Sequence, residues 1–270
     1  MLDRHLMGIL RSFPSLDSLT EFYNELVRTT LEYPDLKKAL GSVKWAMDKI
    51  DEFSGKYEGK LRKCQHLRKI SDYSSEYYGR VGSIMKQVKK HLKYLDHARQ
   101  VMRDYPSIKS GMPTVCIAGF PNVGKTTLLL KLTGSAPEIS NYAFTTKKLN
   151  VGYATMNREK VQFIDTPGTL DRVDKMNPIE KQAYLSIKYC ADLVVFVADP
   201  TETYPLQDQK RLLARVLKGG KPVFLYISKT DISSEEQIRI VENTLKSSGL
   251  VFIKTIENLK NEIIHLLIQG

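Results

Sequence analysis

The stretch that decides the fold is Gly119-Phe-Pro-Asn-Val-Gly-Lys-Thr126. It lies between two apolar runs, residues 115–118 and 128–130, so we expect a strand before it and a helix after it. It matches the phosphate-binding pattern G-x-x-x-x-G-K-[ST]. Its glycines let successive backbone N–H groups point at phosphate oxygens, the lysine reaches the β- and γ-phosphates, and the threonine hydroxyl binds Mg²⁺. The stretch therefore predicts a site for a nucleoside triphosphate.

The phosphate loop supplies the first set of candidate site residues. Lys125 is expected to act in catalysis, and Thr126 is expected to bind the metal. The residues expected to contact the nucleotide are Gly119, Phe120, Pro121, Asn122, Val123, Gly124, Lys125, Thr126 and Thr127.

A second motif, Asp165-Thr-Pro-Gly168, closes the apolar run 161–164. An aspartate at the end of such a strand can hold Mg²⁺ through water, and the glycine N–H can meet the γ-phosphate. Alone, this pattern is more often an ordinary turn, but behind a phosphate loop it favours a switch. We expect Asp165, Thr166, Pro167 and Gly168 to line the nucleotide site, with Asp165 as a metal ligand and Gly168 acting in catalysis.

A third motif, Ser228-Lys-Thr-Asp231, follows the apolar run 223–227 and resembles the N/T-K-x-D motif of GTP-binding proteins. The Asp231 carboxylate can accept hydrogen bonds from guanine N1–H and the exocyclic amine, and adenine offers no such donor pair. Lys229 can lay its stem across the ring. We therefore expect Ser228, Lys229, Thr230 and Asp231 to bind guanine. Because Ser228 replaces the usual asparagine, its shorter side chain predicts weaker binding.

A fourth motif, Tyr142-Ala-Phe-Thr-Thr146, lies between the expected helix and the next strand. One threonine hydroxyl in such a segment closes over Mg²⁺ when the γ-phosphate is bound. We prefer Thr146 to Thr145 as this metal ligand and catalytic residue. On its own, a pair of threonines would indicate only β-propensity.

These motifs together resemble the Obg-like GTPases, and within them the nucleolar GTP-binding protein branch. Two further stretches share the resemblance: Leu170-Asp171, and Asp199-Pro-Thr-Glu-Thr203 with Gln209 downstream. The resemblance extends upstream, to Phe13-Pro-Ser-Leu-Asp17, Lys38-Ala-Leu-Gly41 and Arg62-Lys-Cys-Gln-His-Leu-Arg68. It implies a GTPase in assembly of the large ribosomal subunit, with a helical domain that contacts ribosomal RNA. The long carboxy-terminal extension of eukaryotic members is not in this sequence, so the chain is similar to a compact, archaeal-type member.

The order of the elements predicts an α/β fold, in which a P-loop GTPase with a doubly wound sheet follows an all-α helical bundle. Residues 1–110 are expected to form a basic helical domain that binds RNA or the ribosome, and residues 111–270 the GTPase domain. Apolar stripes at helical spacing predict two long helices, over 43–64 and 81–102, and Ser18 to Glu21 resembles a capping box. Strands are expected near 114–118, 147–154, 160–165, 192–198, 223–228 and 250–254.

The uneven distribution of charged residues along the chain indicates what kind of partner it binds. The net charge is +11, and residues 60–109 carry 13 lysines and arginines against 4 acids, whereas residues 113–270 carry 20 against 16. Such a run is usually a solvated helix face. Two features favour binding to ribosomal RNA instead: too few acids to balance the basic residues, and aromatic rings that could stack on unpaired bases. The rings are those of Tyr73, Tyr77, Tyr78 and Tyr94. The residues expected to take part are some of Arg62, Lys63, Arg68, Lys69, Lys86, Lys89, Lys90 and Lys93.

The expected ligands are GTP or GDP with Mg²⁺, and the expected partner is the precursor of the large ribosomal subunit with its rRNA. Asn122 either tolerates a turn or helps bind K⁺ beside the phosphates. Thr169 replaces the glutamine that orients water in Ras-type enzymes, which predicts slow hydrolysis. A nucleotide-sensing RNA- or protein-binding module with negligible hydrolysis remains an alternative, and an RNA-modifying enzyme would need a further catalytic cluster.

The location of the protein is expected to be cytoplasmic. The longest apolar run, residues 193–198, is the length of a strand and far shorter than a membrane span, and residues 1–5 show no signal-peptide pattern. Three scattered cysteines indicate reduced thiols. Neither a membrane partner nor DNA specificity is predicted.

Overall fold

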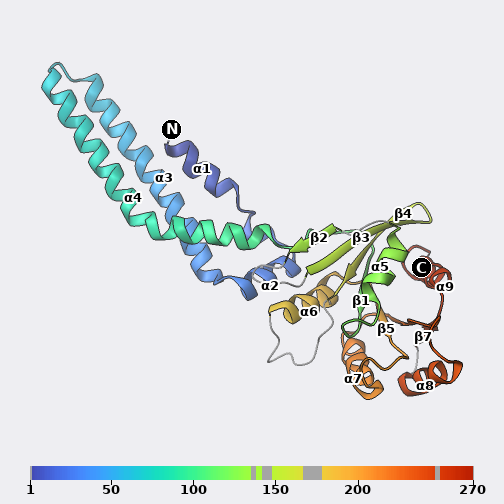
Figure 1. Cartoon of the computed structure of the whole chain (residues 1–270). Helices are drawn as coiled ribbons and strands as arrows, with labels where there is room; N and C mark the ends of the chain where they lie inside the picture. The colour runs from blue at the N-terminus through green and yellow to red at the C-terminus, as the bar shows by residue number, and fades with distance from the viewer. Residues whose placement is uncertain (1, 135–137, 142–147, 167–177, 247–249, 270) are drawn as a thin grey trace. The chain divides into compact units, whose positions relative to one another are not determined.

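The computed structural model describes residues 2–134, 138–141, 148–166, 178–246 and 250–269. The chain divides into two compact units, Met1–Arg103 and Asp104–Gly270. The first unit is all helical and the second is built on one β-sheet, which confirms the predicted fold class (Figure 1).

The helical unit is dominated by a hairpin of two long helices, α3 and α4, which lie side by side (Figure 1). Its helices are α1 (Leu2–Arg11), the 3₁₀ turn η1 (Leu16–Ser18), α2 (Glu21–Thr30), α3 (Tyr33–Arg62) and α4 (Leu67–Arg103). Apolar residues three and four apart on each helix face the seam, and side-chain hydrogen bonds cross it farther along. The buried residues on α3 and α4 are Leu36, Ala39, Val43, Ala46, Met47, Ile50, Tyr57, Ile84, Val88, Leu95, Ala98 and Val101.

Two details of the helical unit differ from the sequence-based expectation. The predicted capping box is wrong. The N-cap residue of α2 is Thr20, which makes no side-chain cap, and the Ser18 hydroxyl donates instead to the carbonyl of Ser15, the residue before η1 (3.0 Å). The predicted apolar stripe of α3 is also not buried over its whole length, because Leu61 near the hairpin tip is 39% exposed. Trp45, the only tryptophan of the chain, lies on α3 and is 41% exposed.

The second unit has a seven-stranded sheet in the order β2-β3-β4-β1-β5-β6-β7. Its strands are β1 (Thr114–Ala118), β2 (Glu138–Asn141), β3 (Lys148–Met156), β4 (Glu159–Asp165), β5 (Leu193–Ala198), β6 (Val223–Ile227) and β7 (Val251–Ile253). β4, β1, β5, β6 and β7 are parallel, while β2 and β3 are antiparallel to their neighbours. The sheet is therefore mixed, whereas the sequence suggested strands of the parallel type throughout.

Helices cover both faces of this sheet. They are α5 (Lys125–Thr133), α6 (Pro178–Cys190), α7 (Leu206–Leu217), α8 (Glu235–Leu245) and α9 (Ile256–Leu267). Successive side chains of a strand point to opposite faces, so Cys116 of β1 packs with residues of α6, α7 and α8. Its neighbours Val115 and Ile117 pack with residues of α5 and α9.

A two-residue turn, Asn157-Arg158, joins the antiparallel strands β3 and β4. Asn157 and Arg158 both have positive φ (45° and 71°), as a two-residue type I′ hairpin requires. β4 then returns parallel to β1, so β4, β1, β5 and β6 all end at the same edge of the sheet. The motifs that follow these strands meet there.

Candidate functional site

The phosphate loop connects β1 to α5, as its sequence predicts. Three of its residues have left-handed backbone conformations: Gly119 (φ 148°), Asn122 (φ 61°) and Gly124 (φ 97°). A Cβ at Gly119 would lie 2.7 Å from the carbonyl oxygen of Val197, so only glycine fits there. The loop is thus bent by residues that tolerate the bend, and α5 begins directly behind it, with its N–H groups at the loop.

The phosphate-loop lysine is held by the loop itself. The Lys125 ammonium donates to the carbonyl oxygen of Phe120 at 2.6 Å, and the side chain is 7% exposed. This bond places a positive charge inside the curve of the loop, next to the N-terminus of α5. Both the ammonium and the helix end favour an anion at this point.

Beside the loop, Thr126 and Asp165 form a donor set that fits Mg²⁺. The Thr126 hydroxyl donates to Asp165 Oδ2 at 2.6 Å, and the Asn150 amide donates to the same oxygen at 3.1 Å. Asp165 Oδ1 is buried and has no partner among the described residues. Burial raises the pKa of Asp165, although the Thr126 hydrogen bond, the Lys125 charge and the Asn150 hydrogen bond oppose it. A hard cation with oxygen ligands would satisfy the unpartnered oxygen.

The other predicted residues of the first two motifs have different surroundings. Val123 is fully buried in the core, so its side chain is structural. The Thr166 hydroxyl donates to the Ile117 carbonyl at 2.8 Å and so holds the residue that follows β4 against β1. Thr127 is exposed on α5, and Pro121 is half-buried. Predicted residues Thr146, Pro167 and Gly168, with Thr145 and Thr169, lie outside the described residues.

The predicted base motif follows β6. The backbone N–H and the hydroxyl of Ser228 both donate to the Ala198 carbonyl (2.9 and 3.0 Å), so the hydroxyl bonds β5 and not the phosphate loop. Ser228 nevertheless lies against the loop, because a Cβ at Gly124 would be 3.7 Å from its Cβ. Thr230 is half-buried and Asp231 is exposed. The motif therefore lies next to the phosphate loop without the side-chain bond that an asparagine would supply.

Lys229 makes a contact that the motif alone does not predict. Its ammonium donates to Asp199 Oδ2 at 2.6 Å and lies 3.3 Å from the hydroxyls of Thr201 and Thr203. The Asp199 side chain is fully buried. Burial alone would raise the pKa of Asp199, but the hydrogen bonds from Lys229, Thr201 and Thr203 outweigh it and hold the pKa below its ordinary value.

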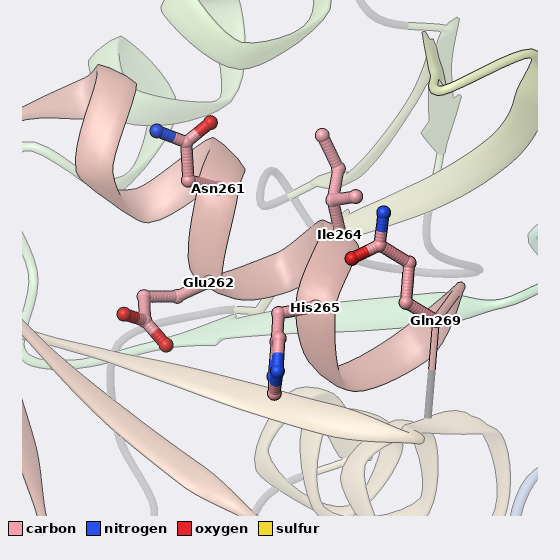
Figure 2. A pocket seen from close by; sticks show the side chains of 5 residues that line it. All are labelled: Asn261, Glu262, Ile264, His265 and Gln269. Carbon is pink, nitrogen blue, oxygen red and sulfur yellow. The ribbon is translucent and has the colours of Figure 1, made fainter.

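Outside the motifs, the described residues contain a hollow away from the candidate site, no cluster of metal-binding side chains and no membrane-spanning helix. A hollow of about 450 Å³ on α9 contains none of the predicted residues; it is lined by Asn261, Glu262, Ile264, His265 and Gln269 (Figure 2). Within the described ranges, no group of three or more His, Cys, Asp or Glu residues could hold a metal ion. In the same part of the chain, no helix is long and apolar enough to cross a membrane.

Comparison with known proteins covers both units. A family model described as 50S ribosome-binding GTPase matches residues 114–229. A second model, described as NOG1 N-terminal helical domain, matches residues 1–109. The two matches are adjacent along the chain.

Relatives match most of the chain. An uncharacterized protein of Methanocaldococcus jannaschii is 38% identical over 239 residues, which are 87% of this chain and 67% of that protein. Nucleolar GTP-binding protein 1 of Drosophila melanogaster is 34% identical over 244 residues, 86% of this chain but 36% of the fly protein. The chain therefore spans little more than a third of that relative. Among solved structures, the cytosolic domain of the T. maritima FeoB iron transporter is 30% identical, with a TM-score of 0.46, and the match covers 57% of this chain and 63% of that one.

Proposed function

The chain belongs to the nucleolar GTP-binding protein family, and on that premise we propose that it is a slow GTPase switch in assembly of the large ribosomal subunit. It would bind GTP or GDP in its P-loop GTPase domain and dock on ribosomal RNA through its basic helical unit. We place this activity in the cytoplasm, in keeping with three free cysteines.

The observation that carries the nucleotide part is the unpartnered Asp165 Oδ1 beside the Thr126 hydroxyl. A buried oxygen without a partner is costly, and Mg²⁺ bound with the nucleotide would remove that cost. Lys125 would contact the phosphates, with Thr146 and Gly168 closing on the γ-phosphate. The exposed Asp231 would accept the guanine N–H groups.

Departures at the base end support weak holding of the nucleotide, whereas slow turnover rests on Thr169, which lies outside the described residues. Ser228 bonds β5, so it does not brace the phosphate loop. Only residues 254 and 255 separate β7 from α9, and the Thr255 hydroxyl caps α9 by accepting from the Asn258 N–H at 3.3 Å. This short connection supports a site without the loop that usually contacts guanine O6. K⁺ beside Asn122 would then supply positive charge to the transition state.

The helical unit supports an RNA partner through unpaired charge. Lys86, Lys89, Lys90 and Lys93 are exposed on α4 and make no ion pair with any residue that the structure describes. Arg62, in contrast, pairs with Glu58. Of the four interleaved tyrosines, Tyr78 is the most available for stacking on a base, because it is 69% exposed.

Three assays test this function. GTP and ATP affinities are compared by calorimetry, GTP turnover is measured with and without large ribosomal subunits, and co-sedimentation with those subunits is followed against salt. Preference for GTP with turnover stimulated by the subunits is expected. Equal affinities would overturn guanine recognition, and GTP binding without turnover in either condition would favour the nucleotide-sensing module.

A matched pair of charge reversals tests the docking surface. Lys89→Glu with Lys93→Glu should weaken rRNA binding and flatten its salt dependence, because fewer counterions are released. Lys210→Glu with Lys218→Glu changes the net charge equally at two exposed positions of the second unit and should have little effect. If both double variants lose equal affinity, binding follows net charge and the α4 surface has no special role.

A further inference from the structure

The segment Asp199-Pro-Thr-Glu-Thr-Tyr204, here called the 199–204 loop, lies between the two halves of the candidate nucleotide site. It follows β5, and β5 pairs with both β1 and β6. β1 leads into the phosphate loop and β6 leads into the base motif. The loop therefore has a place at the site, although none of the nucleotide-binding motifs contains its residues.

The shape of the 199–204 loop is fixed by one buried side chain. Gln209 is 1% exposed; its Oε1 accepts from the Asp199 N–H at 3.0 Å, and its amide donates to the carbonyls of Asp199 (3.0 Å) and Tyr204 (2.9 Å). Both ends of the loop are thus tied to the same residue of α7. Within the loop, the N–H and hydroxyl of Thr201 donate to Asp199 Oδ1 at 2.9 and 2.7 Å.

Each end of the loop contacts a different half of the site. At one end, Asp199 Oδ2 accepts from the Lys229 ammonium at 2.6 Å. At the other end, the Tyr204 ring stacks on the ring of Phe120 in the phosphate loop, with centroids 4.5 Å apart and planes inclined by 23°. A single fixed segment therefore touches both the base motif and the phosphate loop.

We propose that the 199–204 loop is a purine-positioning element, in which Asp199 and Tyr204 set the placement of the residues that bind the nucleotide. Asp199 draws the charged end of Lys229 aside, so that the apolar stem of the lysine faces the purine ring. Tyr204 holds Phe120 and so fixes the phosphate loop relative to the base motif. The inference rests on the proposed function, because the ligand is taken to be GTP or GDP.

A double-mutant cycle on the full chain tests the role of Asp199. GDP affinity is measured by calorimetry for the wild type, Asp199→Asn, Lys229→Ala and the double variant. Asp199→Asn should weaken binding about tenfold, or about 1.4 kcal/mol. The double variant should bind no more weakly than Lys229→Ala alone, because no lysine is left to position. Losses that add in the double variant would show that Asp199 acts only on the general structure.

A second pair of variants keeps the proposal testable if Asp199→Asn fails to fold. Tyr204→Ala removes the stack on Phe120 and should weaken GDP binding several-fold, whereas Tyr204→Phe keeps the ring and should restore wild-type affinity. Asp208→Asn, which removes an exposed partner of Arg211, is the matched control. If the wild type does not bind GDP, the proposed function fails; if it binds and the loop variants bind equally well, only this inference fails.

Discussion

Two buried aspartates at the same edge of the sheet differ in how completely the protein satisfies them. Asp199 accepts hydrogen bonds on both oxygens, and its pKa lies below the ordinary value. Asp165 accepts on Oδ2 only, Oδ1 has no partner within the described residues, and burial raises its pKa. The protein thus satisfies both oxygens of Asp199, whereas Asp165 Oδ1 stays available to the cation that the proposed function requires.

This difference separates two kinds of effect. Leaving a buried polar atom unpartnered costs about 1–3 kcal/mol, and a cation bound at Asp165, as proposed above, would remove that cost. Changes at the phosphate end should therefore alter ligand binding, and changes at Asp199 should also alter the stability of the chain without ligand. The following variants are ordered from the largest expected effect to the smallest.

Lys125→Ala should abolish measurable Mg²⁺–GTP binding, a loss of at least about a hundredfold. The lysine supplies the positive charge inside the phosphate loop, and no other described side chain donates to the Phe120 carbonyl. Calorimetry measures the loss. Lys131→Ala, at an exposed lysine of the same helix, is the control and should bind normally. Equal affinities of the two variants would remove Lys125 from the site.

Asp199→Asn should lower the free energy of unfolding by about 2 kcal/mol at neutral pH, because a buried charge-assisted hydrogen bond is lost. The folded pKa of Asp199 is depressed, so its stabilisation is present above the ordinary value of 3.8 and is lost as pH falls through the folded pKa. Urea unfolding of both proteins across this range should show the difference shrinking in acid. A difference that stays constant with pH would mean that the charge of Asp199 does not matter.

Asp165→Asn should remove about tenfold of the affinity that Mg²⁺ adds to GTP binding. The wild type and the variant are compared in Mg²⁺ and in EDTA, and they should differ in Mg²⁺ only. The variant should be about as stable as the wild type without nucleotide, since it removes a buried charge with one unpartnered oxygen. An unchanged response to Mg²⁺ would exclude Asp165 as a metal ligand.

Asn122→Gly should remove a stimulation of GTP turnover by K⁺ of about threefold, the smallest effect in the series. Glycine tolerates the φ of 61° at this position, so the turn is kept while the side-chain amide is lost. Rates are measured in KCl and in NaCl. If the wild type turns over equally fast in both salts, Asn122 serves the turn alone.

Local patterns predicted where the described candidate residues gather, because each of their motifs follows a strand of the sheet. β1, β4 and β6 end at one edge, so Lys125, Asp165 and Ser228 meet there as expected. The Asp199–Lys229 contact joins residues 30 positions apart, and no periodicity reports such a pair. The only sequence feature that pointed to this contact was the segment that starts at Asp199, with Gln209 downstream, and it was noted only as part of the family resemblance.

The antiparallel part of the sheet was missed for a different reason. Asn157-Arg158 forms the hairpin turn between β3 and β4. Arg158 stands where such turns usually have glycine, so the sequence of the turn predicts a hairpin only weakly. The spacing of only two residues between the strands leaves no room for a helix. The length of the connection was therefore a better guide to antiparallel pairing than the residues of the turn. Ser18 failed as a cap because its hydroxyl donates to the Ser15 carbonyl instead.

The position of Trp45 makes the chain its own optical reporter. As the only tryptophan, on a half-exposed face of α3, it reports the environment of the helical unit alone, while the second unit contains none. Emission excited at tryptophan wavelengths would follow melting of the helical unit, and far-ultraviolet circular dichroism would follow both units together. Coincident transitions would mean that the two units unfold as one cooperative system, and separated transitions would give each unit a stability of its own.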